Sequence, residues 1–126
     1  MVGIVIVSHS EKLAQGVAEL AGMMASEAPV VAAGGLDDGT LGTSFEKITK
    51  AVDSVYSDDG VLILMDMGSA VMTAEMVLES MPDRKIKMVD CPLVEGAVVA
   101  AIGSSSNQNM EEIIEAAQES ASEKKL

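Results

Sequence analysis

The first ten residues constrain the fold of this chain more than any other stretch. A β-branched apolar run from Val2 to Val7 stops abruptly at Ser8, and a pattern of helical spacing begins directly afterwards. A run of this kind is typical of a strand that is buried on both faces of a parallel sheet. His9, the only histidine of the chain, stands at the junction. Because ligands of open α/β sheets bind at the carboxyl ends of the strands, His9 is the first candidate for a functional residue, although a lone histidine is often only structural.

The rest of the chain alternates apolar runs with helical patterns, which predicts an α/β fold. Further strands are expected over residues 29–33, 61–65 and 86–90, and helical patterns cover residues 13–24, 43–55, 70–80, 93–102 and 109–121. This order requires right-handed crossovers, so we predict a doubly wound, mainly parallel sheet of four to five strands with helices on both faces. A chain of 126 residues suffices for one full core, so one domain is expected over residues 1–121, with a frayed tail over residues 122–126.

Polar residues at the starts of three helical patterns predict N-caps. Ser8 or Ser10 can cap the first helix, Thr43 and Glu46 have the spacing of a capping box, and the segment Asn109 to Glu112 has the same spacing. The first of these caps would place the helix N-terminus beside the histidine.

Composition excludes several classes of function. A net charge of −12 repels a nucleic-acid backbone, and 2% aromatic residues leave few rings for base stacking, so no nucleic-acid partner is expected. The single cysteine cannot form an internal disulfide, and no signal-peptide pattern precedes the first helix, which favours a cytoplasmic protein. No apolar run approaches the ~20 residues of a spanning helix, so no contact with a membrane is expected.

A carboxylate joins the histidine if strands one and three are neighbours. Asp66 follows the most apolar run of the chain, residues 61–65, and therefore ends at the same sheet edge as His9. An aspartate that accepts from one imidazole nitrogen fixes the tautomer and leaves the lone pair of the other nitrogen free to attack. We therefore predict that His9 is a nucleophile and that Asp66 orients it through Nδ1, with the chemistry at Nε2.

Glycine-rich turns near this edge suggest what the histidine attacks. Backbone N–H groups at such turns and at helix N-termini bind anions, and four residues are candidates for holding a phosphoryl group: Gly39, Thr43, Gly68 and Ser69. Phosphoryl transfer is the leading prediction. The chain has no Walker motif and no G-x-S-x-G elbow, and one histidine with one cysteine is too few for a zinc site, so no metal is expected.

Four segments carry a resemblance to a known family. They are Val7-Ser8-His9-Ser10, the loop from Ala33 through Gly39 to Thr43, Met65-Asp66-Met67-Gly68-Ser69-Ala70, and Pro92-Leu93-Val94-Glu95-Gly96-Ala97. Together they resemble the mannose-family enzyme IIA domains, and within them most closely the phosphotransfer subunits of the phosphoenolpyruvate-dependent dihydroxyacetone kinases. The resemblance covers essentially the whole chain.

The resemblance implies a role and a set of partners. His9 would accept a phosphoryl group from the histidine phosphocarrier protein HPr and pass it to ADP on the nucleotide-binding subunit of dihydroxyacetone kinase. The chain itself would bind no cofactor, since ADP and ATP reside on the partner subunit. A homodimer and a further edge strand are also implied. The apolar segment Leu93 to Ile102 is a candidate for the dimer contact, because it has more apolar positions than one sheet-facing stripe needs.

Two other functions fit the same residues. A sugar-specific enzyme IIA of the mannose family would use the same histidine but donate to a IIB domain of a transporter. A non-catalytic regulatory module would be read by a partner in its phosphorylated state. The acceptor of the phosphoryl group separates these alternatives.

Overall fold

The four apolar runs form the four strands of one parallel sheet. The computed structural model describes all 126 residues. Its strands are β1 (Gly3–Ser8), β2 (Val30–Gly34), β3 (Val61–Met65) and β4 (Ile86–Val89), in the order β2-β1-β3-β4. The predicted α/β class and the predicted pairing of the first and third strands are confirmed, with Val7 opposite Met65.

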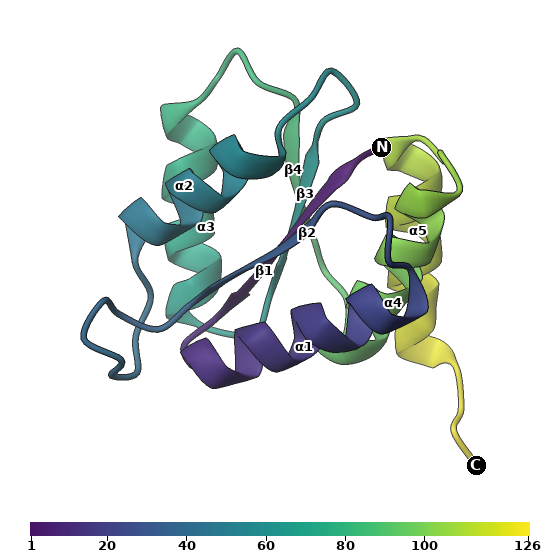
Figure 1. The fold of residues 1–126 in the computed structure, drawn as a ribbon, viewed down its shortest axis with the longest axis horizontal. Coiled ribbons are helices and arrows are strands. Elements are labelled where there is room, and N and C mark those ends of the chain that lie inside the picture. The colour runs from purple at the N-terminus through teal and green to yellow at the C-terminus, as the bar shows by residue number, and fades with distance from the viewer.

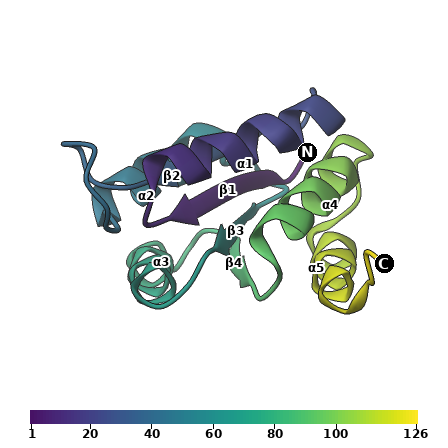
Figure 2. The ribbon, with the colours of Figure 1, turned by 90° about the horizontal axis from the view of Figure 1, so that it is seen from below.

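Helices cover both faces of the sheet, as the apolar character of its strands requires. Helices α1 (Glu11–Met24), α4 (Leu93–Ser105) and α5 (Met110–Glu119) lie on one face, and α2 (Phe45–Val55) and α3 (Ser69–Ser80) lie on the other (Figures 1 and 2). A short 3-10 turn, Ser120–Ser122, follows α5. The side chains of β1 alternate between two cores, with Ile4 and Ile6 in one and Val5 and Val7 in the other. Every residue of β1 is therefore buried.

The helix starts agree only partly with the predicted caps. Ser10 is the N-cap of α1 and accepts from the N–H of Leu13 at 3.1 Å. The capping box predicted from Thr43 is wrong, because the N-cap of α2 is Ser44, one residue later. The box of Asn109 and Glu112 is present in full at the start of α5.

The segment after β4 forms a helix rather than a fifth strand. The sheet has four strands, the lower of the two predicted numbers, and residues 93–105 form α4. Its inner face is built from alanines that let the helix approach the sheet closely, whereas Val94 and Ile102 remain 41% and 43% exposed. This flank of α4 is the part of the predicted dimer segment that the fold leaves uncovered.

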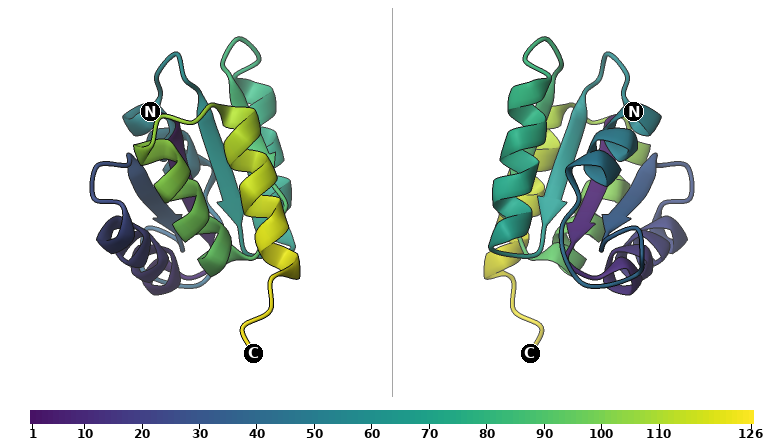
Figure 3. Two further views of the ribbon diagram at one scale, coloured as in Figure 1. Left: turned by 90° about the vertical axis from the view of Figure 1, so that its right-hand side faces the viewer. Right: turned by 90° about the vertical axis from the view of Figure 1, so that its left-hand side faces the viewer.

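The carboxyl ends of the strands gather at one edge of the molecule. In both views of Figure 3 the arrowheads point toward the same edge, where the long loop after β2 also lies. The carboxyl ends of β1 and β3, which are neighbouring strands, therefore lie side by side at this edge. None of the helices combines the length and the apolar character needed to cross a bilayer.

Candidate functional site

His9 and Asp66 meet because they follow neighbouring strands in register. The N–H of Asp66 donates to the carbonyl of Val7 at 3.1 Å, which continues the β1–β3 ladder by one step. This bond brings the carboxylate of Asp66 next to His9, the residue that follows Ser8. The Nδ1 atom of His9 lies 3.0 Å from Oδ1 of Asp66. The structure therefore places the two predicted catalytic side chains in contact.

The carboxylate of Asp66 accepts from every group around it. Oδ2 accepts from the backbone N–H of His9 at 3.0 Å and from the hydroxyl of Ser8 at 2.9 Å, and Oδ1 accepts from the N–H of Met67 at 2.7 Å. Burial acts to raise the pKa of Asp66, but these hydrogen bonds outweigh it and hold the pKa below its ordinary value. Asp66 is consequently ionised near neutral pH and can only accept.

An ionised Asp66 determines the tautomer of the neutral histidine ring. Since the carboxylate has no proton to donate, Nδ1 of His9 carries the hydrogen, and the lone pair of the ring lies on Nε2. The hydroxyl of Ser69 is 2.7 Å from Nε2 and donates to it. The histidine side chain is 27% exposed, and Nε2 lies at its more exposed edge, because the contact with Ser69 is exposed whereas the contact with Asp66 is partly buried.

The turn before α3, whose Ser69 hydroxyl contacts Nε2, has backbone N–H groups that are free of partners. Gly68 is the N-cap of α3 and has a φ of +52°, a conformation that a residue with a side chain adopts only at a cost. The N–H groups of Gly68 and Ser69 form no hydrogen bond within the protein. Donors at a helix N-terminus favour an anion. Of the predicted phosphate-binding residues, Ser69 thus contacts Nε2 through its hydroxyl, and Gly68 precedes it in the chain.

The loop between β2 and α2 is attached to the site through its backbone. The N–H of Gly42 donates to the carbonyl of His9 at 2.9 Å. The N–H of Gly39 donates to Leu36 within the loop, and the hydroxyl of Thr43 lies 2.9 Å from that of Thr73 on α3. Gly39 and Thr43, the other two predicted phosphate-binding residues, therefore form no bond to the histidine. Their contacts fix the path of the loop.

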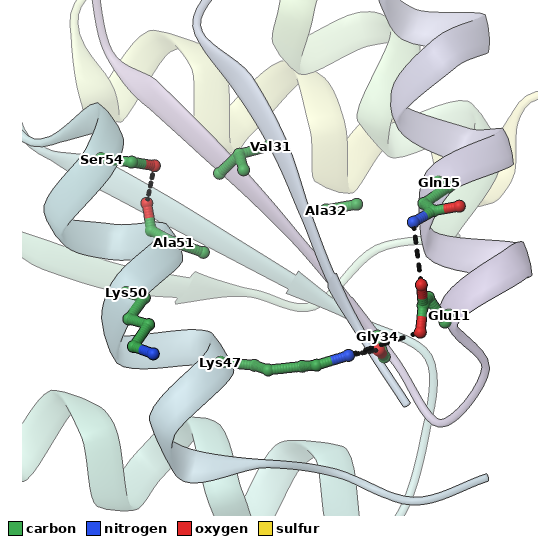
Figure 4. Close-up of a pocket in the computed structure, with 9 residues that line it drawn as sticks. All are labelled: Glu11, Gln15, Val31, Ala32, Gly34, Lys47, Lys50, Ala51 and Ser54. Atoms are coloured by element: carbon green, nitrogen blue, oxygen red, sulfur yellow. Dashed lines mark hydrogen bonds and ion pairs between the residues drawn. The ribbon is translucent and has the colours of Figure 1, made fainter. Parts of the chain in front are cut away.

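A lysine fixes the start of the same loop. The ammonium group of Lys47 donates to the carbonyl of Gly34 at 3.0 Å and pairs with Glu11 at 3.5 Å (Figure 4). It also donates to the carbonyl of Leu36 at 3.3 Å. This clamp lies in a groove of about 310 Å³ along the free edge of β2, between α1 and α2. Gly34 permits the close approach of α1, because a Cβ there would lie 2.5 Å from the carbonyl oxygen of Ser10.

Three contributors were not predicted from the sequence. Ser8 was interpreted as a cap, yet its fully buried hydroxyl donates to Asp66 and accepts from the N–H of Ser10 at 3.0 Å. The hydroxyl of Thr73 joins the loop to the carbonyl of Ser69, and Gly42 bonds the histidine backbone. Ser8 gave a signal, as the one polar residue at the end of an otherwise apolar run, and Gly42 lies in the glycine-rich loop. No sequence signal indicated Thr73.

The thiol of Cys91 forms no part of the hydrogen-bond network around His9 and Asp66. Burial, with a smaller contribution from Asp90, raises the pKa of the Cys91 thiol to about 11. Its Sγ atom fills the space beside Gly96, where a Cβ would lie only 2.3 Å away. A protonated, packed thiol is a poor nucleophile. The structure contains no group of three or more histidine, cysteine or acidic side chains arranged to hold a metal ion.

The fold and the site define a class of protein: a parallel α/β domain whose strand-end histidine contacts a carboxylate through one ring nitrogen and the N-terminus of a helix through the other. Residues 3–118 match the model of the family described as PTS system fructose IIA component, EIIA-man. The chain belongs to this family.

The relatives narrow the comparison further. The chain is 39% identical over 121 residues to the PEP-dependent dihydroxyacetone kinase, phosphoryl donor subunit DhaM, of Escherichia coli, covering 90% of this chain but only 26% of that protein. It is 35% identical over 119 residues to the corresponding subunit of PEP-dependent dihydroxyacetone kinase 2 of Listeria innocua, covering 91% of this chain and 95% of that one. The crystal structure of a protein of unknown function, EF1359, superimposes with a TM-score of 0.85 at 32% identity, covering 99% of this chain and 98% of the other.

Proposed function

We propose that this chain is the phosphoryl donor subunit of a phosphoenolpyruvate-dependent dihydroxyacetone kinase and that it works through a phosphohistidine at His9. The observation that carries the proposal is the contact of Nδ1 with the ionised Asp66, which leaves the lone pair on Nε2. The names of the relatives from Escherichia coli and Listeria innocua support the same role.

The transfer follows from the arrangement of three side chains. The lone pair of Nε2 attacks the phosphorus of the phosphorylated carrier HPr, and the P–N bond of the carrier breaks with its electron pair returning to the carrier nitrogen. Nδ1 keeps its hydrogen throughout, so the His9 ring becomes positively charged, and Asp66 stabilises that charge. The hydroxyl of Ser69, released from Nε2, then donates to a phosphoryl oxygen.

The second step reverses the first with a different acceptor. An oxygen of ADP, held on the nucleotide-binding kinase subunit, attacks the phosphorus; the bond to Nε2 breaks and its electron pair returns to the ring. The chain needs no nucleotide site of its own for this step. We expect the reaction to take place in the cytoplasm, and the subunit to work as a homodimer that uses the uncovered flank of α4 at Val94 and Ile102.

The family description favours one competing acceptor. The family is described as a fructose IIA component, and such a component would pass the phosphoryl group to a IIB domain of a sugar transporter instead of to ADP. The chemistry at the histidine is the same in both cases, so the identity of the acceptor distinguishes the two functions.

One experiment tests the histidine and the acceptor in sequence. The protein is incubated with labelled phosphoenolpyruvate, the general phosphotransferase enzyme and HPr, and we expect one acid-labile, alkali-stable label that His9→Ala abolishes. Label that persists in His9→Ala, or that survives acid as a serine ester would, contradicts the proposal. The isolated labelled protein is then divided between the kinase subunit with ADP and a IIB domain, and labelled ATP is the expected product. Transfer to the IIB domain alone would establish the sugar alternative.

A further inference from the structure

Ser8 differs from the other buried polar residues of the protein in what its hydroxyl binds. Three polar residues are buried, and all are serines: Ser8, Ser104 and Ser120. The hydroxyls of Ser104 and Ser120 donate to backbone carbonyls, whereas that of Ser8 donates to the carboxylate of Asp66 at 2.9 Å. Hydrogen bonds to an ionised acceptor are roughly twice as strong as those between neutral groups. The hydroxyl of Ser8 therefore acts on the group that orients the histidine.

A second contact fixes the direction of the hydrogen bond at Ser8. The backbone N–H of Ser10 donates to Oγ of Ser8 at 3.0 Å. A serine hydroxyl has one hydrogen and an ionised carboxylate has none, so the hydrogen of Ser8 lies between Oγ and Oδ2 of Asp66. Because Ser10 is the N-cap of α1, the hydroxyl of Ser8 connects the start of this helix to the carboxylate.

The donation from Ser8 completes the set of hydrogen bonds that the carboxylate of Asp66 can accept. The two oxygens of a carboxylate offer about four acceptor positions. On Oδ2 two of them are filled by the N–H of His9 and the hydroxyl of Ser8. On Oδ1 the other two are filled by the N–H of Met67 and by Nδ1 of the histidine ring. With all four positions filled, the carboxylate has one preferred orientation.

We propose that Ser8 is a positioning residue for the reaction at His9, and that its hydroxyl holds the Asp66 carboxylate in the orientation that keeps the hydrogen of the histidine ring on Nδ1. The hydroxyl acts through the carboxylate, since its two hydrogen bonds are with Asp66 and with the N–H of Ser10. The effect on phosphoryl transfer rests on the proposed function. The effect on the ring is a property of the unphosphorylated protein and is measurable without any transfer.

Removal of the hydroxyl would loosen the carboxylate and, through it, the ring. In Ser8→Ala protein Oδ2 of Asp66 loses one of its two donors, so the carboxylate can turn about its Cβ–Cγ bond. Oδ1 then leaves the line of the Nδ1–H bond, and the hydrogen bond to the ring weakens. The ring hydrogen distributes between both nitrogens, and fewer molecules have the lone pair on Nε2.

The first measurement is the tautomer of the neutral histidine ring, by ¹⁵N NMR of protein labelled in histidine. Because the chain has one histidine, every ring signal comes from His9, and the couplings to the ring hydrogens show which nitrogen is protonated. We expect the hydrogen on Nδ1 in the wild type and a mixture of both tautomers in Ser8→Ala. Ser8→Thr keeps the hydroxyl and should match the wild type.

The second measurement is the rate of transfer from saturating phosphorylated HPr. We expect Ser8→Ala to lower this rate by about ten- to a hundredfold, because a small misplacement of a reacting group can cost about 10²-fold, and Ser8→Thr to retain most of it. Ser104→Ala is the matched control, since it removes an equally buried serine hydroxyl that donates to the carbonyl of Val2, just before β1 begins. It should lose stability in urea but keep the wild-type tautomer and rate.

The outcomes separate this inference from the proposed function. If the wild type takes no label on His9, the proposed function fails, and the tautomer measurement still tests the role of Ser8. If folded Ser8→Ala protein keeps the hydrogen on Nδ1, or transfers as fast as Ser104→Ala, the proposal is overturned and Ser8 is a structural residue. Folded Ser8→Thr protein that behaves like Ser8→Ala also overturns it. If Ser8→Ala does not fold, Ser8→Cys, whose thiol is a weak donor, replaces it with the same expected results.

Discussion

Replacing Asp66 by asparagine changes one carboxylate oxygen into an NH2 group, and neither position is suited to a donor. At one position the NH2 group faces the backbone N–H of His9, and at the other it faces the N–H of Met67. Either arrangement places two donors against each other and leaves a backbone N–H without a partner. An unsatisfied donor of this kind costs about 1–3 kcal/mol, which is the expected loss in the free energy of unfolding.

The same substitution acts on the reaction through the histidine ring. An NH2 group beside Nδ1 would donate to it, the ring hydrogen would move to Nε2, and the attacking lone pair would be lost. In the other orientation the negative charge that stabilises the charged ring is still missing. Positioned acid–base groups contribute about 10²- to 10⁴-fold to rates, so we expect Asp66→Asn to slow phosphoryl transfer within that range.

The assay measures both quantities on one protein. Rapid quenching after mixing with saturating phosphorylated HPr gives the transfer rate, and urea unfolding gives the stability. Asp90→Asn is the control, since it removes the same charge from an exposed carboxylate directly after the neighbouring strand β4. Asp66→Asn protein that is less stable but transfers at the wild-type rate would refute the mechanism and leave Asp66 a structural residue.

Acid titration of stability gives a second check on Asp66. The pKa of this carboxyl lies below its ordinary value of 3.8 in the folded protein, because its hydrogen bonds outweigh the effect of burial. A lowered pKa contributes stability that is present above the ordinary value and is lost as pH falls through the lowered one. The difference in unfolding free energy between wild type and Asp66→Asn should therefore narrow below about pH 4. A difference that stays constant down to acid-induced unfolding would contradict this account.

Three further predictions concern the surroundings of the site and the assembly. Ser69→Ala should slow transfer by about ten- to a hundredfold in the rapid-quench assay, because a hydrogen bond to a charged group contributes about 1.5–3 kcal/mol; an unchanged rate would exclude a role for the hydroxyl. Gly34→Ala should destabilise the fold by about 1–3 kcal/mol, since its Cβ would lie 2.5 Å from the carbonyl oxygen of Ser10. Gly16→Ala, in open space on α1, should instead stabilise the fold by about 0.5–1 kcal/mol. If urea unfolding gives both changes in stability the same sign, the packing argument is wrong. Sedimentation should give a mass twice the 13.0 kDa of one chain, and Ile102→Glu should reduce it to one chain; a monomeric wild type at micromolar concentration would reject the dimer.

The central pair of the site could be predicted because its signals are local. Apolar runs mark β1 and β3 by composition alone, and polar residues directly after them fall at one sheet edge in any doubly wound fold. His9 and Asp66 needed only the pairing of those two strands. The turn at Gly68 was also a local signal, since a glycine before a helical pattern marks a tight turn.

The supporting contacts could not be predicted because they depend on packing between distant segments. A serine at a strand end can cap a helix or form a hydrogen bond with a side chain that follows another strand. The hydrogen bond between Ser8 and Asp66 depends on the register of β1 against β3, and the sequence of neither strand alone determines that register. The same holds for Thr43, whose hydroxyl pairs with Thr73 on a helix 30 residues away. The capping box assigned to Thr43 failed for the simpler reason that Ser44, one residue later, offers an equivalent hydroxyl.

The hydrogen bonds between Asp66 and the end of β1 join residues 57 and 58 positions apart in the chain. They exist only once the two central strands have paired, and such long-range pairing of parallel strands is intrinsically slow. In a chain whose β1 and β3 have not paired, Asp66 does not orient the imidazole ring of His9. Under the proposed function, only folded molecules would therefore take up a phosphoryl group. The labelled fraction of a preparation would then measure its correctly folded fraction, and misfolded copies would not consume phosphoryl groups from the carrier.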